Sequence, residues 1–317
     1  MESAGVFEKH RSLLFTIAYE ITGTASDAED VVQDSFLRWS QVDAKAVVNP
    51  RAYLAKTVTR QALNSLRTAQ RRREDYIGPW LPEPVITAPD VAEHAVLSES
   101  LSFAMLVVLE TLSPDERAVF VLREVFDFPY ADIAEATDKS LAAVRQMASR
   151  AKAHVRARRP RFEVDAQRQR AVADRFLKAL LGGDMQSLMD ALAPGAVLLS
   201  DGGGKVTAAR KPVIGADNIT RFLAGIAKTP VPQMRVELSF FNGMPALVVY
   251  SGDTVDVVAL VESNNEYVTG VYLVRNPDKL GAATEARSFR TLTALEQDWQ
   301  KLDTPHDYPQ SLSAASH

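Results

Sequence analysis

Four prolines inside the segment 76–95, YIGPWLPEPVITAPDVAEHA, limit what this chain can fold into more than any other feature. Proline has no backbone N–H and a fixed φ angle, so repeated prolines exclude a helix and favour an extended spacer. The chain of 317 residues is long enough for two or three domains. We therefore expect separate folded modules on the two sides of this spacer.

The module after the spacer has the helix order of a DNA-binding motif. A capping box at Ser113, Pro114 and Glu116 predicts the start of one helix. A short helix over 130–137 and a tight turn then lead to a helix over 140–161. This order is typical of a helix-turn-helix, in which the second helix reads the major groove.

The predicted helix 140–161 has an apolar seam and a basic face. From Arg145 to Arg161 there are seven Arg or Lys residues and no acid, so a polyanion is the expected partner. Taken alone, the run fits a solvated basic helix as well as a DNA-binding one.

The module before the spacer combines an acidic helix with a basic one. After a first helix over 7–19, Ser26 is expected to cap the next, with Glu29 three residues further on. Three acids share one stripe of that second helix: Asp27, Asp30 and Asp34. Acids favour a helix N-terminus, which accounts for Asp27 but poorly for Asp34. The stripe indicates a surface that binds protein.

A third helix over 51–73 carries basic residues along one side. Between Lys56 and Arg73 there are six basic residues and no acid. The residues expected to face the core are Leu54, Val58, Ala62 and Leu66. Two basic helices on one chain indicate bipartite DNA recognition.

Composition excludes several classes of protein. The chain has no cysteine, which excludes disulfides and thiol chemistry, and its histidines lack the spacing of zinc ligands. No run approaches the roughly eighteen apolar residues of a membrane span, and the acidic start at Glu2 does not resemble a signal peptide. We expect a cytoplasmic protein with no metal, no cofactor and no membrane association. The net charge of −4 hides strong local segregation.

The chain beyond residue 163 is predicted to form an α+β domain. Helices are expected over 165–181, 184–191 and 216–226. Short runs rich in Val, Leu and Tyr predict strands, joined as antiparallel hairpins, over 196–200, 235–240, 246–250, 255–261 and 267–274. A curved sheet of this kind could enclose a cavity, and an apolar ligand there is an open alternative.

Several of these motifs resemble a known family. The octet 27–34, the helix 51–73, and Leu112-Ser113-Pro114 leading to Val144-Arg145-Gln146 and Ser149-Arg150-Ala151 resemble regions two and four of the extracytoplasmic-function (ECF) sigma factors of bacterial RNA polymerase. The segments 80–84, 201–205 and 276–280 resemble motifs of the ECF subgroup with a fused SnoaL-like domain. One departure is Asn64, where the family often has Asp.

The resemblance implies a multidomain, non-enzymatic protein. Its expected parts are sigma region two at 1–75, a linker at 76–97, sigma region four at 98–162, a cone-shaped SnoaL-like regulatory domain at 163–281 and a tail at 282–317. Both sigma regions would be all-α. The implied partners are the clamp of core RNA polymerase and promoter DNA. The fused domain makes a separate anti-sigma factor less necessary without excluding one.

The family's functional positions carry over to four groups of residues in this chain. Those expected to bind polymerase are Asp27, Asp30, Gln33 and Asp34. Those expected at the minus-ten element are Lys56, Arg60, Asn64 and Arg67. Those expected at the minus-thirty-five element are Arg145, Gln146, Ser149, Arg150, Lys152 and Arg156. Those expected in regulatory contacts between domains are Trp80, Pro82, Glu83, Asp201, Gly203, Lys205, Asn276, Asp278 and Lys279.

Trp80 suggests how the C-terminal domain acts, because a tryptophan in a spacer usually packs against something. We expect it to dock on the loop 201–205 and to help set the spacing of the two DNA-binding modules. Packing against its own prolines is the alternative. Asp201 and Lys205 are either an acid–base pair or the ends of a glycine turn, and the glycines favour the turn.

Two other classes of protein compete with a sigma factor. One is a small-molecule enzyme or ligand sensor that DNA-binding helices attach to DNA, and the other is a helical interaction protein with solvated basic faces. The acidic stripe favours the sigma factor, since a repressor needs no polymerase-binding face. No catalytic residue is expected, because the C-terminal histidines, His306 and His317, lie in the tail. A helical patch over 292–302 either docks or frays.

Overall fold

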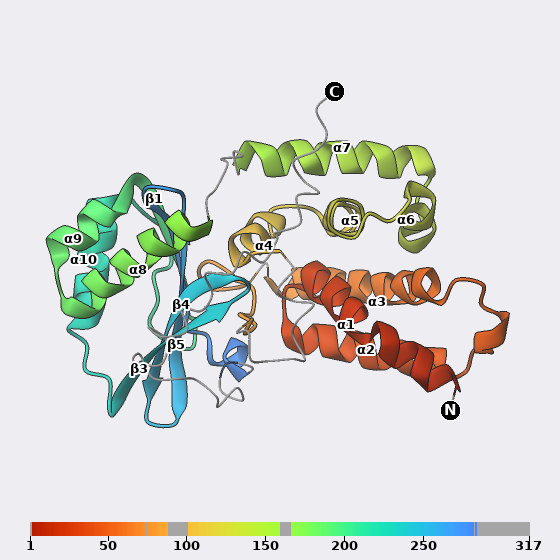
Figure 1. The fold of residues 1–317 in the computed structure, drawn as a ribbon, viewed down its shortest axis with the longest axis horizontal. Helices are drawn as coiled ribbons and strands as arrows, with labels where there is room; N and C mark the ends of the chain where they lie inside the picture. Colours follow the sequence, from red (N-terminus) through yellow and green to blue (C-terminus); the bar gives the residue numbers. More distant parts are fainter. Residues whose placement is uncertain (1, 74, 88–100, 159–165, 282, 284–317) are drawn as a thin grey trace.

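The computed structural model describes residues 2–73, 75–87, 101–158, 166–281 and 283 (Figure 1). The predicted patch over 292–302 and both tail histidines lie outside these ranges. Within them, no helix combines the length and apolar character that a membrane span requires.

Region two is a bundle of three helices that pack through their apolar faces. The helices are α1 (Glu2–Thr22), α2 (Ala25–Trp39) and α3 (Pro50–Arg73). Trp39 and Tyr19 are fully buried in its core. The predicted core positions of the third helix are all buried there too, which confirms its amphipathic pattern.

The predicted cap at Ser26 is wrong, because Ser26 lies inside α2, which starts at Ala25. The Glu83 carboxylate Oε2 accepts hydrogen bonds from the backbone N–H groups of Ala25 (2.8 Å) and Ser26 (3.3 Å). Free N–H groups at a helix start need an acceptor and favour a negative charge. A residue 58 positions away in the sequence supplies it, so a local pattern could not reveal it.

Region four contains four helices and a π-helical turn. They are α4 (Phe103–Leu109), α5 (Pro114–Phe120), the turn Val121–Val125, α6 (Tyr130–Thr137) and α7 (Leu141–Arg158). The capping box between Ser113 and Glu116 is confirmed. The tight turn is confirmed as well: Asp138 has a φ of 57°, and Ser140 Oγ accepts from Ala143 N at 3.2 Å. The sequence pattern did not predict α4.

The C-terminal domain is an α+β unit, as expected for a SnoaL-like fold. Its helices are α8 (Ala166–Gly182), α9 (Met185–Ala191) and α10 (Ala216–Ala227). Its strands are β1 (Leu192–Asp201), β2 (Val213–Ile214), β3 (Met234–Phe241), β4 (Met244–Ser251), β5 (Thr254–Ser263) and β6 (Val268–Val274).

The six strands form one sheet in the order β2-β1-β6-β5-β4-β3. The predicted hairpins are confirmed for β3 through β6, but β1 pairs with β6 in parallel. The expectation of antiparallel pairing alone therefore needs correction. Parallel strands need a long crossover connection, and here the whole segment between β1 and β6 forms that connection. No local turn signal in the sequence could therefore indicate that the two strands pair.

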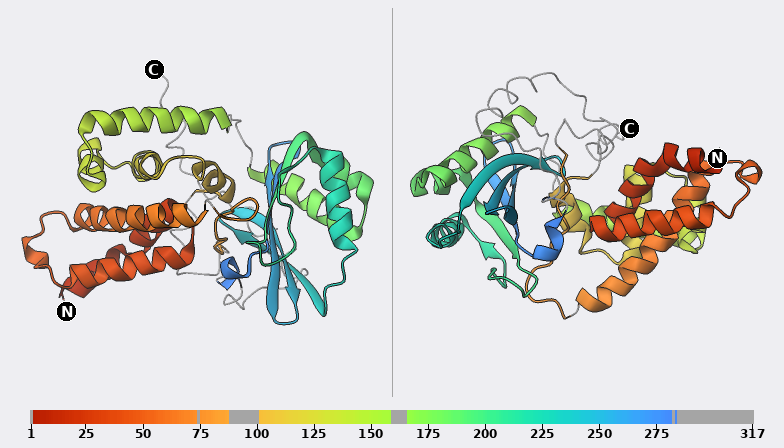
Figure 2. Two further views of the ribbon diagram at one scale, coloured as in Figure 1. Left: turned by 180° about the vertical axis from the view of Figure 1, so that it is seen from behind. Right: turned by 90° about the horizontal axis from the view of Figure 1, so that it is seen from below.

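Both faces of the sheet are covered (Figures 1 and 2). Helices α8, α9 and α10 cover one face, which is filled by apolar side chains that include Leu198, Leu238 and Leu247. The linker and α4 cover the other face, where the Phe103 and Tyr272 rings lie 5.6 Å apart. The C-terminal domain thus packs directly on the linker and on the first helix of region four.

Candidate DNA-binding faces and interdomain clasp

The predicted polymerase-binding residues lie on the outer side of α2. Asp30, Gln33 and Asp34 are exposed, whereas the Asp27 carboxylate accepts a hydrogen bond from the Thr24 hydroxyl at 2.6 Å. The three acids and Asn64 of α3 line a polar cleft of about 360 Å³ between the two helices. Asp30 and Asp34 are therefore accessible to another protein, whereas Asp27 is engaged in a local hydrogen bond.

The predicted minus-ten face of α3 is paired with region four. Arg60 Nη2 donates to the backbone oxygen of Glu135 at 2.8 Å, and Lys56 forms an ion pair with the Glu135 carboxylate. Arg67 Nη2 donates to Asp115 Oδ1 at 2.7 Å. Acidic groups of α5 and α6 thus occupy the positions next to these cations where phosphates are expected to bind.

A cation–π contact and apolar packing hold the same two surfaces together. The guanidinium of Arg51 lies 4.9 Å from the centre of the Phe128 ring, and Ala55 and Thr59 of α3 are buried. The cores of regions two and four form one continuous apolar cluster. In this compact arrangement, region four pairs with the cations of the predicted minus-ten face, although Arg60, Asn64 and Arg67 remain exposed.

The predicted minus-thirty-five face of α7 points outward. Arg145, Gln146, Ser149 and Arg156 are exposed. The other two cations are held within region four, Lys152 by Glu124 at 2.6 Å and Arg150 by Glu116 at 3.4 Å. These pairs orient the helix and leave its first turns free to approach DNA.

A buried ion pair joins the linker to the C-terminal domain. Asp201 is fully buried, and its Oδ2 accepts from Lys279 Nζ (2.7 Å) and from the Leu81 N–H (2.9 Å). Its Oδ1 accepts from the Tyr76 hydroxyl (2.5 Å) and the Gly203 N–H (3.0 Å). Each carboxylate oxygen thus has two donors, which is what a buried charge requires.

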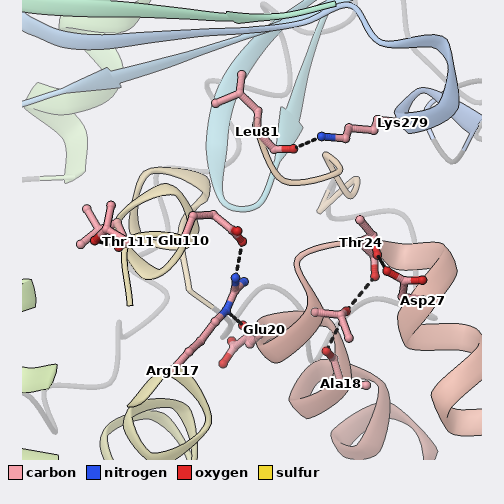
Figure 3. Close-up of polar contacts among 11 residues, drawn as sticks. Ala18, Glu20, Thr24, Asp27, Leu81, Glu110, Thr111, Arg117 and Lys279 are labelled. Carbon is pink, nitrogen blue, oxygen red and sulfur yellow. Dashed lines mark hydrogen bonds and ion pairs between the residues drawn. The ribbon is translucent and has the colours of Figure 1, made fainter. Parts of the chain in front are cut away.

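Lys279 makes two further contacts with the linker, and Figure 3 shows the one with the Leu81 carbonyl. Its ammonium also donates to the Leu81 carbonyl at 2.6 Å and lies 3.8 Å from the centre of the Trp80 ring. Burial and the nearby Asp201 carboxylate raise the pKa of the Tyr76 phenol, so Tyr76 stays a proton donor. We call Tyr76, Trp80, Leu81, Asp201 and Lys279 the clasp.

The glycine turn after Asp201 is shaped by its neighbours in the clasp. Gly203 has a φ of 60°, and a Cβ there would come within 2.5 Å of the Asn276 side chain, which donates to the Tyr76 hydroxyl at 2.9 Å. Lys205 pairs at the surface with Asp278 at 2.6 Å. The turn interpretation is confirmed, since Asp201 and Lys205 have different ionic partners.

A second tie connects the linker to region two. Pro82 and Glu83 are buried, and the Glu83 backbone oxygen accepts from the Tyr19 hydroxyl at 2.7 Å. Asn242 donates to that hydroxyl at 2.8 Å and accepts from the Val85 N–H at 3.0 Å. The sequence did not reveal the roles of Tyr19 and Asn242. Tyr19 lies on the buried face of a helix, and Asn242 lies in a segment predicted to be a hairpin turn.

Two sigma-factor families match the helical part of the chain. Residues 6–72 match Sigma-70 region 2, and residues 102–155 match Sigma-70, region 4.

Relatives extend the similarity to the C-terminal domain. The chain is 36% identical to the ECF RNA polymerase sigma factor SigJ of Mycobacterium tuberculosis over 287 residues, 86% of this chain and 91% of that protein. It is 28% identical to the probable ECF RNA polymerase sigma factor SigI of the same species over 82% of this chain and 93% of that one. The crystal structure of M. tuberculosis SigJ aligns with a TM-score of 0.72 at 32% identity, over 88% of this chain and 98% of that one.

Proposed function

The chain belongs to the ECF sigma factors, the non-enzymatic subunits that direct RNA polymerase to promoters, and we propose that its C-terminal domain controls this activity from within the chain. The control acts through the clasp, which holds the linker and with it the spacing of regions two and four. The protein acts in the cytoplasm, together with core polymerase and promoter DNA. Such control needs no separate anti-sigma factor.

The buried Asp201–Lys279 pair is the observation that carries this proposal. A sigma factor reads two promoter elements at once, so its DNA-binding faces must both be open. Here the minus-ten face of α3 pairs with Glu135 and Asp115, while the clasp and α4 fasten the linker and region four to the sheet. A tethered domain acts at high effective concentration, so modest contacts suffice to hold the compact state.

The residue roles follow the faces described above. The exposed acids Asp30 and Asp34 bind the polymerase clamp. The cations of α3 that contact the minus-ten element after region four moves away are Lys56, Arg60 and Arg67. The outward face of α7 contacts the minus-thirty-five element. Opening is driven by partners that bind the open chain, because a ligand shifts an equilibrium by its difference in affinity for the two states.

Trp80→Ala tests the clasp. The change removes the ring beneath the Lys279 ammonium, a contact worth about 0.5–2 kcal/mol. We expect promoter-specific transcription with core polymerase to rise several-fold, while thermal unfolding of the full chain changes little. Tyr267→Ala, at an exposed aromatic of the same domain, is the control and should leave transcription unchanged. Equal transcription from both variants, with the linker still docked, would remove the proposal.

Asp115→Asn combined with Glu135→Gln tests whether the acidic groups of region four compete with DNA for the cations of α3. Exposed ion pairs are weak and screened by salt, so we expect a modest gain, roughly two- to tenfold tighter binding of a short fluorescent single-stranded oligonucleotide at low salt. The matched control is Asp127→Asn with Asp138→Asn. It changes the charge equally within region four, and asparagine suits the positive φ of both sites. If both double variants bind equally well, region four does not compete with DNA.

A further inference from the structure

Regions two and four meet at a buried cluster of charged groups outside the clasp (Figure 3). Glu20, in the last turn of α1, is fully buried, and Arg117 of α5 is 1% exposed. Glu110, at the end of α4, faces the same guanidinium. Charged side chains are almost never buried to this extent without complete pairing.

The hydrogen bonds of this cluster are incomplete. Arg117 Nε donates to the backbone oxygen of Glu20 at 2.7 Å, and Arg117 Nη1 pairs with the Glu110 carboxylate. The Leu101 N–H donates to Glu20 Oε1 at 3.0 Å. Among the described residues, Glu20 Oε2 and Arg117 Nη2 are buried with no hydrogen-bond partner. Counting donors from the described residues, the Glu20 carboxyl has one, whereas the buried carboxyl of Asp201 has four.

Charge counting gives the same result as the hydrogen bonds. The Glu20 and Glu110 carboxyl groups both lie near the Arg117 guanidinium, and Glu110 already forms an ion pair with it. Ionisation of Glu20 therefore adds an excess negative charge beside a cation that is already paired. The space is tight: a Cβ on Gly23, the residue just after α1, would lie 2.8 Å from Glu110 Oε1 and 3.1 Å from Arg117 Nη2. A proton on Glu20 removes the excess charge without a new partner.

The other titratable groups near Glu20 do not compensate its charge. On its own helix the neighbour is the Tyr19 phenol, whose pKa burial raises. The Glu83 carboxyl of the linker, whose pKa burial also raises, acts on Tyr19 and is not among the groups that shift the pKa of Glu20. Burial raises the pKa of Glu20 to about 8, against smaller opposing effects of the Leu101 N–H and Arg117.

We propose that Glu20 is a proton-sensitive latch between regions two and four: the compact arrangement holds a proton on its carboxyl, and separation of the regions releases that proton to water. The inference rests on the proposed function in one respect, because only the proposed function gives the separation of these regions a role in promoter binding. The cluster adjoins the clasp at Trp80, whose ring edge would lie 3.0 Å from the same Cβ on Gly23, so Trp80→Ala is kept out of the latch test.

The direction of the pH dependence follows from the two states. In the open chain Glu20 is solvated and titrates near its ordinary pKa of 4.5, and in the compact chain its pKa is about 8. Below the first value both states are protonated, so closure does not depend on pH. Between the two values the compact state alone holds the proton, and its ratio to the open state falls up to about tenfold per pH unit. A rise in pH therefore opens the chain.

The absence of cysteine allows a direct measurement on the full chain. Ser40→Cys on region two and Ala153→Cys on α7 are exposed positions for a pair of fluorophores. We expect energy transfer between them to fall as the pH rises from about 5.5 to about 8.5 at constant salt. Glu20→Gln keeps the acceptor for the Leu101 N–H and should flatten the change of energy transfer with pH. Any pH dependence that remains in this variant is due to Glu83. Glu8→Gln, at an exposed site on α1, should leave it intact.

Two results would overturn the latch: no pH dependence in the unsubstituted labelled chain, or the same slope in Glu20→Gln. Neither depends on polymerase or on the effect of Trp80→Ala, so failure of the clasp and failure of the latch are distinguishable. If Glu20→Gln does not fold, titration of ¹³C-labelled glutamate carboxyls in the unsubstituted chain decides. A signal assigned to Glu20 that titrates with a pKa of about 8 supports the latch, and ordinary titration of Glu20 contradicts it.

Discussion

Lys279→Met is expected to release the linker from the C-terminal domain at a cost of about 3–5 kcal/mol, because removing one partner of a buried ion pair leaves the other charge uncompensated. The Lys279 and Asp201 side chains are 7% and 0% exposed. Methionine fills a similar volume but provides no charge for the Asp201 carboxylate and no donor for the Leu81 carbonyl. Amide hydrogen exchange of residues 75–87 measures the effect directly. Protection there should fall by roughly two to three and a half orders of magnitude.

Lys205→Met is the matched control for this prediction. It removes the same charge from the neighbouring Lys205–Asp278 pair, whose side chains are 54% and 62% exposed. Exposed pairs contribute at most about 1 kcal/mol, so linker protection should stay within about fivefold of the original. Protection of the α1 amides reports whether region two remains folded. Equal loss of protection in both lysine variants would show that burial of the pair contributes nothing.

The second large effect is expected from Asp30→Arg, which places a cation in the centre of the exposed acidic stripe of α2. Reversing a charge in a protein interface commonly costs about 2–5 kcal/mol, so core polymerase binding and promoter-specific transcription should fall by at least about thirtyfold. Asp190→Arg makes the same charge change at an exposed site on α9 and should leave both unchanged.

Arg145→Glu separates the polymerase face from the DNA face. It should abolish promoter-specific transcription while the chain still binds core polymerase, because α7 lies outside the acidic stripe. A chain that binds its promoter but never recruits core polymerase, with or without Asp30→Arg, would make the polymerase assignment wrong. Transcription with sigma-free core polymerase and a binding assay on the same samples give both readouts.

The periodicity of the sequence predicted the elements well where each element contains its own signal. The capping box at Ser113 and the apolar positions of α3 are local patterns, and both are confirmed. The prediction failed where a local signal had a distant competitor. Ser26 has the residue type of a cap, but the Glu83 carboxylate reaches the same N–H groups and α2 begins one residue earlier.

The candidate site divides in the same way. The three segments 80–84, 201–205 and 276–280 were predicted to act together, and the structure brings Trp80, Asp201 and Lys279 of these segments into one cluster. The second tie, between Tyr19 and Asn242, was not predicted, because it depends on a hydrogen bond between residues 223 positions apart. The assignments to polymerase and promoter contacts rest on the family resemblance and stay predictions.

The sequence by itself determined which segments are helices and strands, which of their faces are apolar and to which family the helical modules belong, because these depend on neighbours within a few positions. Only the tertiary structure decided that region four pairs with the cations of α3, that Lys279 compensates Asp201 and that Glu20 is buried beside Arg117. Those pairings depend on how folded modules meet. Burial then decides whether removal of one charged partner changes stability very little, as at the surface, or costs several kcal/mol, as in the interior.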